Sequence, residues 1–211
     1  MLRIAVDLDN ILTNSIEAVL QYINRTSQTL VDVIELRSLE TLTRRFPETS
    51  LFWQTTGVYS VHVTLLPGAV EFIQKLESEY GRENVLISTP SIPETRDEKL
   101  ELLRSGLGVD ASRVVFHHHR WHAFADCILV DDHPGHVVSH IRANSAPGVL
   151  LNPENKYGWS RFTTAGVSRV PRALLRHCNS YASAMVEVSK LVEMHYRRLK
   201  PDVRVTEVSS A

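Results

Sequence analysis

Cysteine, net charge and long apolar runs are all scarce in this sequence, and each absence excludes a class of protein. Its two cysteines, Cys127 and Cys178, are too few and too widely spaced for a disulfide framework. A formal net charge of −1 provides no general attraction to nucleic acid or to an anionic membrane surface. No apolar run approaches the ~20 residues that a membrane-spanning helix needs. We therefore expect neither a membrane nor a nucleic acid among its partners.

The composition is that of an ordinary globular protein. The chain has 211 residues, of which 43% are hydrophobic and 22% charged. This length buries one full core and leaves room for a modest insertion. The amino terminus leads directly into an apolar strand, without the pattern of a signal peptide. These features predict a cytoplasmic protein with a single core.

Strands and helices alternate along most of the chain. Continuous apolar runs predict strands at residues 2–6, 84–90, 113–116, 127–132 and 148–152. Helical spacing of apolar residues predicts helices at residues 15–24, 69–80, 94–105, 136–143 and 172–199. Gly106 is the predicted cap of the third helix. Such alternation is typical of βαβ units with right-handed crossovers, so the predicted fold class is α/β with a doubly wound, Rossmann-like parallel sheet.

One segment, between the first helix and residue 66, breaks this alternation. Its elements are short and weakly periodic, as in the stretch Leu30–Leu36. The predicted boundaries are 1–16 and 66–170 for the core, 17–65 for a small helical cap inserted after the first strand, 171–200 for a carboxyl-terminal helix and 201–211 for a frayed tail. The apolar stripe of the carboxyl-terminal helix fits either the sheet or a second subunit, which leaves a homodimer open.

Two carboxylates, Asp7 and Asp9, directly follow the first predicted strand. Open α/β sheets bind ligands in the crevice outside the carboxyl ends of their strands. Two negative charges so close together need a compensating cation or a shared proton. A hard divalent ion such as Mg²⁺ would supply the charge and bring in a phosphate. The alternative is that both are solvated loop residues.

Further polar residues follow other strands at the same predicted edge. They are Ser88 and Thr89, Lys99 on the next helix, and Asp131 with Asp132. Together with the first pair they match the needs of phosphoryl transfer through an aspartyl-phosphate. One carboxylate attacks phosphorus and a second moves the proton, while a hydroxyl and an ammonium hold the phosphate oxygens. A third carboxylate completes a magnesium site.

In these motifs the chain resembles the haloacid-dehalogenase-like phosphohydrolase superfamily. The four matching stretches are Val6–Asp9, Leu86–Thr89, Lys99 and Ile128–Asp132. Within the superfamily it looks most like the 5'(3')-deoxyribonucleotidases. That closer likeness is carried by Leu66–Val70, Ile87–Pro90, Asp97–Lys99 and Leu129–Pro134. The resemblance implies a Mg²⁺-dependent phosphomonoesterase that acts on (deoxy)nucleoside monophosphates.

The resemblance also implies roles for individual residues. Asp7 would be the nucleophile and a magnesium ligand, and Asp9 the general acid/base that offers magnesium its backbone carbonyl. Thr89 would hold the phosphate, with Ser88 as the alternative, and Lys99 would contact both phosphate and nucleophile. Asp132 would be the third magnesium ligand, buttressed by Asp131. Asn10 stands where the family usually has glycine, and asparagine tolerates the left-handed backbone that such a turn needs.

The cap segment matches the family least, and by the resemblance it would hold the nucleoside. Its Phe52 and Trp53 could stack a base, an interaction worth ~1–3 kcal/mol, or pack in the cap core. His117, His118, His119 and His122 could form a structural zinc site or a loop at the rim of the active site, where Arg120 or one of the histidines would reach phosphate. His133 is a further candidate for that rim.

Two other functions fit the same residues. A phosphatase for nucleic-acid ends or sugar phosphates would use the same core with a different cap. A ligand-binding or interaction module would keep the fold without the chemistry, although it has no use for a paired nucleophile and acid. The small phosphorylated substrate of the first hypothesis, a nucleotide, is the expected partner.

Overall fold

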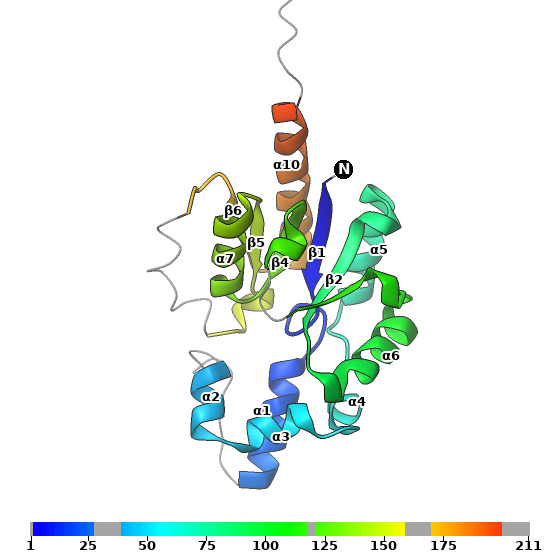
Figure 1. The fold of residues 1–211 in the computed structure, drawn as a ribbon, viewed down its shortest axis with the longest axis vertical. Coiled ribbons are helices and arrows are strands. Elements are labelled where there is room, and N and C mark those ends of the chain that lie inside the picture. The colour runs from blue at the N-terminus through cyan, green and yellow to red at the C-terminus, as the bar shows by residue number, and fades with distance from the viewer. Residues whose placement is uncertain (1, 28–38, 118–120, 159–169, 200–211) are drawn as a thin grey trace, which may run out of the picture.

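The computed structural model describes residues 2–27, 39–117, 121–158 and 170–199. Their strands are β1 (Arg3–Asp7), β2 (Val85–Pro90), β3 (Val114–His117), β4 (Cys127–Asp131), β5 (Gly148–Leu151) and β6 (Leu175–Cys178). All pairs are parallel, in the order β3-β2-β1-β4-β5-β6 (Figure 1). The predicted doubly wound α/β fold is confirmed. The strand order reverses between β1 and β4, so their carboxyl ends border the crevice where such sheets bind ligands.

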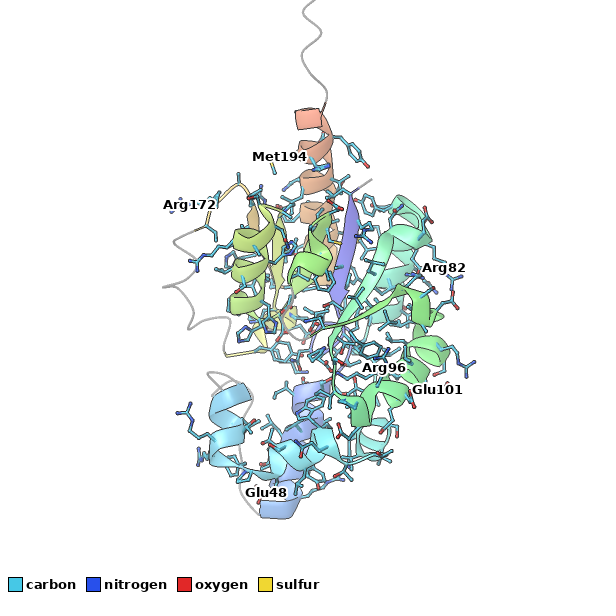
Figure 2. The ribbon with its side chains drawn as sticks, in the orientation of Figure 1. Glu48, Arg82, Arg96, Glu101, Arg172 and Met194 are labelled. Atoms are coloured by element: carbon cyan, nitrogen blue, oxygen red, sulfur yellow. The ribbon has the colours of Figure 1, made fainter. Side chains whose placement is uncertain are left out.

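Helices cover both faces of the sheet. On one face lie α5 (Ala69–Tyr80) and α10 (Tyr181–Leu199), whose apolar residues share a core with Ile4 and Val6. The other face is covered by α7 (Pro134–Asn144) and the 3₁₀ turn Trp121–Phe124. Burial on both faces explains why these strands are continuous apolar runs without alternation. Side chains fill the space between the layers, while charged residues such as Arg82 and Glu101 lie at the periphery (Figure 2).

The described part of the segment before residue 66 is helical. Its helices are α1 (Ser15–Ser27), α2 (Leu39–Arg45), α3 (Glu48–Gln54) and α4 (Val58–His62). They lie beyond the carboxyl ends of the strands (Figure 1) and have an apolar cluster of their own, which includes Ile23, Phe52 and Tyr59. Tyr157, from the loop after β5, is buried in the same cluster. We call these four helices the cap.

The carboxyl-terminal region corrects one prediction. The helix predicted from Arg172 begins only at Tyr181, because Leu175–Cys178 is a strand that pairs with β5. Leu175 and Cys178 fit the spacing of a helix, but the hydrogen bonds of the open sheet edge decide in favour of a strand. The helix α10 packs on the sheet through Ala184, Met185, Val188 and Leu191.

A smaller correction concerns Gly106. It lies inside α6 (Arg96–Leu107), and the helix is capped by Gly108 with the left-handed φ of 65°. A Cβ at Gly106 would approach Leu65 Cδ1 to 2.7 Å. The glycine therefore serves close packing of α6 against the segment before α5.

Some predictions fall on residues 28–38, 118–120, 159–169 and 200–211, which lie outside the described ones. They include the stretch Leu30–Leu36, the residues His118, His119 and Arg120, and the frayed tail. Of the helices that are described, none has the length and apolarity needed to cross a bilayer.

Glu98 of α6 joins the core to the cap. Its two carboxylate oxygens accept hydrogen bonds from the backbone amides of Gly57 and Ser60, each at 2.7 Å. These amides belong to the first turn of α4, whose N–H groups have no partners within the helix. Hydrogen bonds to an ionised acceptor are among the stronger ones in proteins. Glu98 thus seats α4 directly beside Lys99, the next residue of α6.

We expect Glu98→Ala to loosen α4. Loss of a charged acceptor should lower the free energy of local opening by about 2 kcal/mol, and the Gly57 and Ser60 amides should exchange with solvent faster. Hydrogen exchange followed by NMR measures this directly. Asp97→Ala, which removes the neighbouring exposed carboxylate, is the matched control. Unchanged exchange at both amides in Glu98→Ala would show that contacts other than Glu98 hold α4 in place.

Candidate active site

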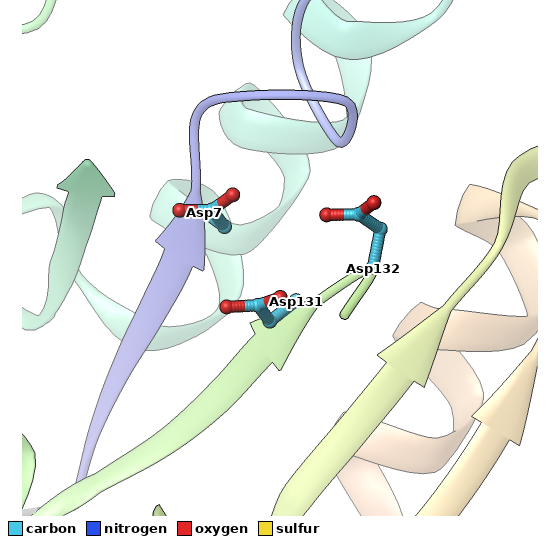
Figure 3. A group of neighbouring side chains, drawn as sticks. All are labelled: Asp7, Asp131 and Asp132. Atoms are coloured by element: carbon cyan, nitrogen blue, oxygen red, sulfur yellow. The ribbon is translucent and has the colours of Figure 1, made fainter. Parts of the chain in front are cut away.

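Three carboxylates meet at the carboxyl ends of β1 and β4. Asp7 is the last residue of β1, and Asp131 and Asp132 end and follow β4 (Figure 3). One carboxylate oxygen from each lies within 4.8 Å of the others. Their exposures are only 6%, 1% and 3%. Pairing of Val6 with Val130 makes Asp7 and Asp131 neighbours across the strands, so the sheet itself enforces their approach.

This cluster favours a bound positive charge. Burial raises the pKa of Asp7 well above its ordinary value, and the charges of Asp131, Asp9 and Asp132 raise it further. Carboxylate oxygens are the ligands that hard divalent cations prefer. Among the described residues this is the one cluster of metal-ligating side chains, and it contains no histidine. The donor set therefore fits Mg²⁺, and Asp7, Asp131 and Asp132 are the residues that would hold it.

Asp131 differs from Asp7 because both of its oxygens accept hydrogen bonds. The backbone amide of His133 donates to Oδ1 at 2.7 Å, and Nδ1 of His136 lies 3.1 Å from Oδ2. Burial opposes ionisation of Asp131, but the charge of His136 and these hydrogen bonds outweigh it and lower the pKa. Asp131 is thus held as a carboxylate beside Asp7.

Asp9 lies two residues from Asp7 in a different environment. Its Oδ2 accepts hydrogen bonds from Lys99 Nζ at 2.7 Å and Thr89 Oγ1 at 3.1 Å. Its Oδ1 accepts one from Ser15 Oγ at 2.6 Å. Burial again opposes ionisation, but the Lys99 ammonium and these donors lower the pKa of Asp9. The site therefore contains two carboxylates with opposed pKa shifts, a feature typical of acid/base pairs.

Lys99 reaches the site from α6 and is completely buried. The resemblance predicts that it contacts the nucleophile Asp7, whereas its hydrogen bonds here go to Asp9 and to Thr89 Oγ1 at 2.8 Å. Its ammonium lies 5.4 Å from the ring centroid of Trp53 and 5.3 Å from that of Tyr59. Cap side chains therefore cover this half of the site, in an arrangement that favours a cation.

The two candidate hydroxyls of β2 face different partners. Ser88 Oγ lies 2.9 Å from Nε2 of His117 on β3, while Thr89 contacts Asp9 and Lys99. Successive residues of a strand point to opposite faces. Thr89 is accordingly the hydroxyl that the structure brings to Asp9, and the alternative role of Ser88 as phosphate ligand finds no support. The partner of His117 is likewise this serine, which does not favour the zinc hypothesis.

Phe52 and Trp53, the aromatic pair of the cap, also have different surroundings. Phe52 is fully buried and its ring centroid lies 5.1 Å from that of Trp53 and 5.7 Å from that of Tyr22. It therefore takes the core-packing role, which corrects its prediction as a base-stacking residue. Trp53 is half-buried and lies beside Lys99, so only its ring is placed to meet a substrate.

The turn after β1 behaves as its sequence predicts. Asn10 has a left-handed φ of 67°, and its Oδ1 accepts a hydrogen bond from the Ile16 amide at 2.9 Å. The same residue thus makes the turn and holds the first turn of α1. That helix begins at Ser15, whose hydroxyl bonds Asp9.

Three residues of the site were not predicted from the sequence. Ser15 and His136 lie a few residues after the acidic motifs, and that spacing was the only available signal. Tyr59 had none, because it reaches Asp9 from 50 residues away, with its hydroxyl 3.4 Å from Oδ1. Burial and the charge of Asp9 raise the pKa of Tyr59 well above its ordinary value, so the phenol stays protonated.

Comparisons with known proteins support the fold. No protein-family model matches the chain, and no curated protein matches it. Among solved structures it is similar to one described as the crystal structure of a hydrolase from Pseudomonas syringae. The TM-score is 0.56 at 16% sequence identity, over 90% of this chain and 98% of that one. A likeness at this identity shows a common fold.

Asp7→Asn should stabilise the protein in the absence of divalent cations. The pKa of Asp7 is raised in the folded state, whereas in the unfolded chain this residue ionises above pH ~4. Above that pH, the preference of the unfolded chain for the ionised form therefore destabilises the fold. The gain should therefore be absent in acid and reach about 1–2 kcal/mol near neutral pH. Urea unfolding across this pH range tests it. Saturating Mg²⁺ should reduce the gain, because only the aspartate provides a charged ligand. An Asn variant less stable at neutral pH would contradict the pKa direction.

Lys99→Met should destabilise the fold by about 3–5 kcal/mol, since it leaves the Asp9 carboxylate buried without its cation. Side-chain exposures of 0% for Lys99 and 13% for Asp9 leave little solvent to compensate. Adding Asp9→Asn should restore most of the loss. A double-mutant cycle by urea unfolding measures this coupling, and simple additivity of the two changes would exclude it.

Proposed function

We propose that the protein is a Mg²⁺-dependent phosphomonoesterase that acts through an aspartyl-phosphate, with (deoxy)nucleoside monophosphates as substrates. One observation carries the proposal, the contrast between two neighbouring carboxylates. Asp7 lies in the buried carboxylate cluster, while Asp9, two residues away, accepts hydrogen bonds from Lys99, Thr89 and Ser15. The pair thus provides a nucleophile beside a cation site and a proton carrier beside a cationic phosphate ligand. A site of this kind matches the chemistry of phosphoryl transfer.

Mg²⁺, when bound, would neutralise the phosphate and lower the pKa of Asp7. Asp7 then attacks phosphorus as its carboxylate, and the bond to the leaving oxygen breaks. Asp9 gives its proton to that oxygen. Asp9 next takes a proton from water, which attacks the aspartyl-phosphate, releases inorganic phosphate and regenerates Asp7.

Lys99 links substrate binding to the protonation of Asp9. The ammonium of Lys99 lowers the pKa of Asp9, which disfavours the acid form. A phosphate that accepts hydrogen bonds from Lys99 and Thr89 would compete with Asp9 for both donors. The pKa of Asp9 would then rise toward the value that burial favours, and the general acid would form only when a phosphate is present.

The substrate class is supported by the cap. Complete burial of Lys99 beneath Trp53 and Tyr59 favours a small ester over the end of a polymer. The half-buried ring of Trp53 is an aromatic surface against which a base could stack. The solved structure of similar fold is described as a hydrolase, which is consistent with hydrolysis as the reaction class. A single fold nevertheless hosts many activities.

Release of phosphate from a panel of esters tests the proposal. The panel contains 5'- and 3'-nucleotides in ribo and deoxy forms, an aryl phosphate, sugar phosphates and a phosphorylated oligonucleotide. We expect turnover of mononucleotides that requires Mg²⁺ and falls at least ~10³-fold in Asp7→Asn and Asp9→Asn. Because Asp7→Asn is expected to be stable, its inactivity would not reflect unfolding.

Other outcomes identify the alternatives. Turnover restricted to sugar phosphates or the oligonucleotide would replace the substrate class and keep the mechanism. Turnover that survives a chelator or Asp7→Asn would refute the mechanism. Ligand binding unaffected by Asp9→Asn, without hydrolysis of any ester, would indicate a binding module.

A further inference from the structure

The start of α7 holds the carboxylate of Asp131 from two sides. The His133 amide donates to Oδ1, and His136, the third residue of the helix, lies 3.1 Å from Oδ2 through Nδ1. A carboxylate oxygen can only accept, so His136 donates its Nδ1 proton. The partial positive charge at the N-terminus of α7 also stabilises the Asp131 carboxylate. The orientation of Asp131 is therefore fixed by α7.

The position of His136 is itself closely determined. Its ring lies 4.5 Å from the ring of His133, centroid to centroid. Pro134 begins the helix, and Gly135 leaves room for the His133 ring, since a Cβ there would lie 3.0 Å from its Cε1. The stretch His133–His136 thus presents the side-chain donor of His136 at a defined place beside Asp131, next to the backbone donor of His133.

We propose that His136 is a positioning residue of the candidate cation site, one that holds Asp131 in place to bind a divalent ion together with Asp7 and Asp132. Three buried carboxylates within 4.8 Å repel one another. Without the donor, Asp131 would turn its oxygens away from the other two and the ligand set would separate. His136 is not itself a ligand through Nδ1, because that atom is engaged with Asp131. The inference rests on the cation of the proposed function but not on hydrolysis.

Titration with Mg²⁺ alone, by calorimetry and by the Mg²⁺-dependent rise in Tm, tests the proposal. Replacing residues that orient metal ligands costs about 10–100-fold in affinity, so His136→Leu should weaken Mg²⁺ binding by this factor. His136→Asn places an amide donor near the position of Nδ1 and should restore binding. His136→Gln carries its donor one bond farther out and should restore less. His195→Asn, on the last turns of α10 at the opposite edge of the sheet, is the matched control.

The outcomes separate clearly. Equal or tighter Mg²⁺ binding by His136→Leu would overturn the proposal, as would a wild-type protein that binds no Mg²⁺. If the Leu variant does not fold, the Asn and Gln variants decide: equal affinities would overturn the proposal, and tighter binding by Asn would support it. Wild-type binding with the expected order of variants, but without hydrolysis of any ester, would leave His136 in this role and refute only the proposed function.

Discussion

Three buried carboxylates, Asp7, Asp131 and Asp132, repel one another at the carboxyl ends of β1 and β4, and the packing of the whole sheet has to hold them together. The register of β1 and β4 places Asp7 beside Asp131, and the residue after β4 adds Asp132. Hydrophobic packing on both faces of the sheet holds these strands together despite the repulsion. The fold thus holds like charges close together at the carboxyl edge of the sheet, where open α/β sheets bind ligands. Such local cost is common at functional sites, where it prepares the protein for a ligand.

The site relieves this repulsion in two separate ways. Asp9 and Asp131 each have their own donors, Lys99 with Thr89 and Ser15 for one, His133 and His136 for the other. Asp7, by contrast, has a raised pKa. The proposed chemistry thus uses as its nucleophile the carboxylate whose pKa is raised, and not one of the two whose pKa is lowered. A cation at the cluster would supply the compensating positive charge for these carboxylates.

The cap completes the half of the site that contains Asp9. Glu98 and Lys99 are consecutive residues of α6, and one seats α4 while the other lies beneath Tyr59 and Trp53. Access to Lys99 and the position of the cap are thus coupled through a single turn of one helix. Core and cap meet at the carboxyl edge, where the substrate of the proposed reaction would be enclosed.

Local patterns in the sequence predict the α/β class, most boundaries of the predicted elements to within two residues, the turn at Asn10 and the acidic residues at the sheet edge. These features follow from local patterns: apolar runs, helical spacing and motifs directly after strands. Three features emerge only from contacts in the folded chain: Leu175–Cys178 is a strand, Thr89 rather than Ser88 faces Asp9, and Phe52 packs in the core of the cap. Each of these depends on a partner distant in the chain, as do the pairing of Lys99 with Asp9 and the approach of Tyr59. Hydrogen bonds and burial between remote segments leave no periodic signal, because the sequence encodes them only through the complete fold.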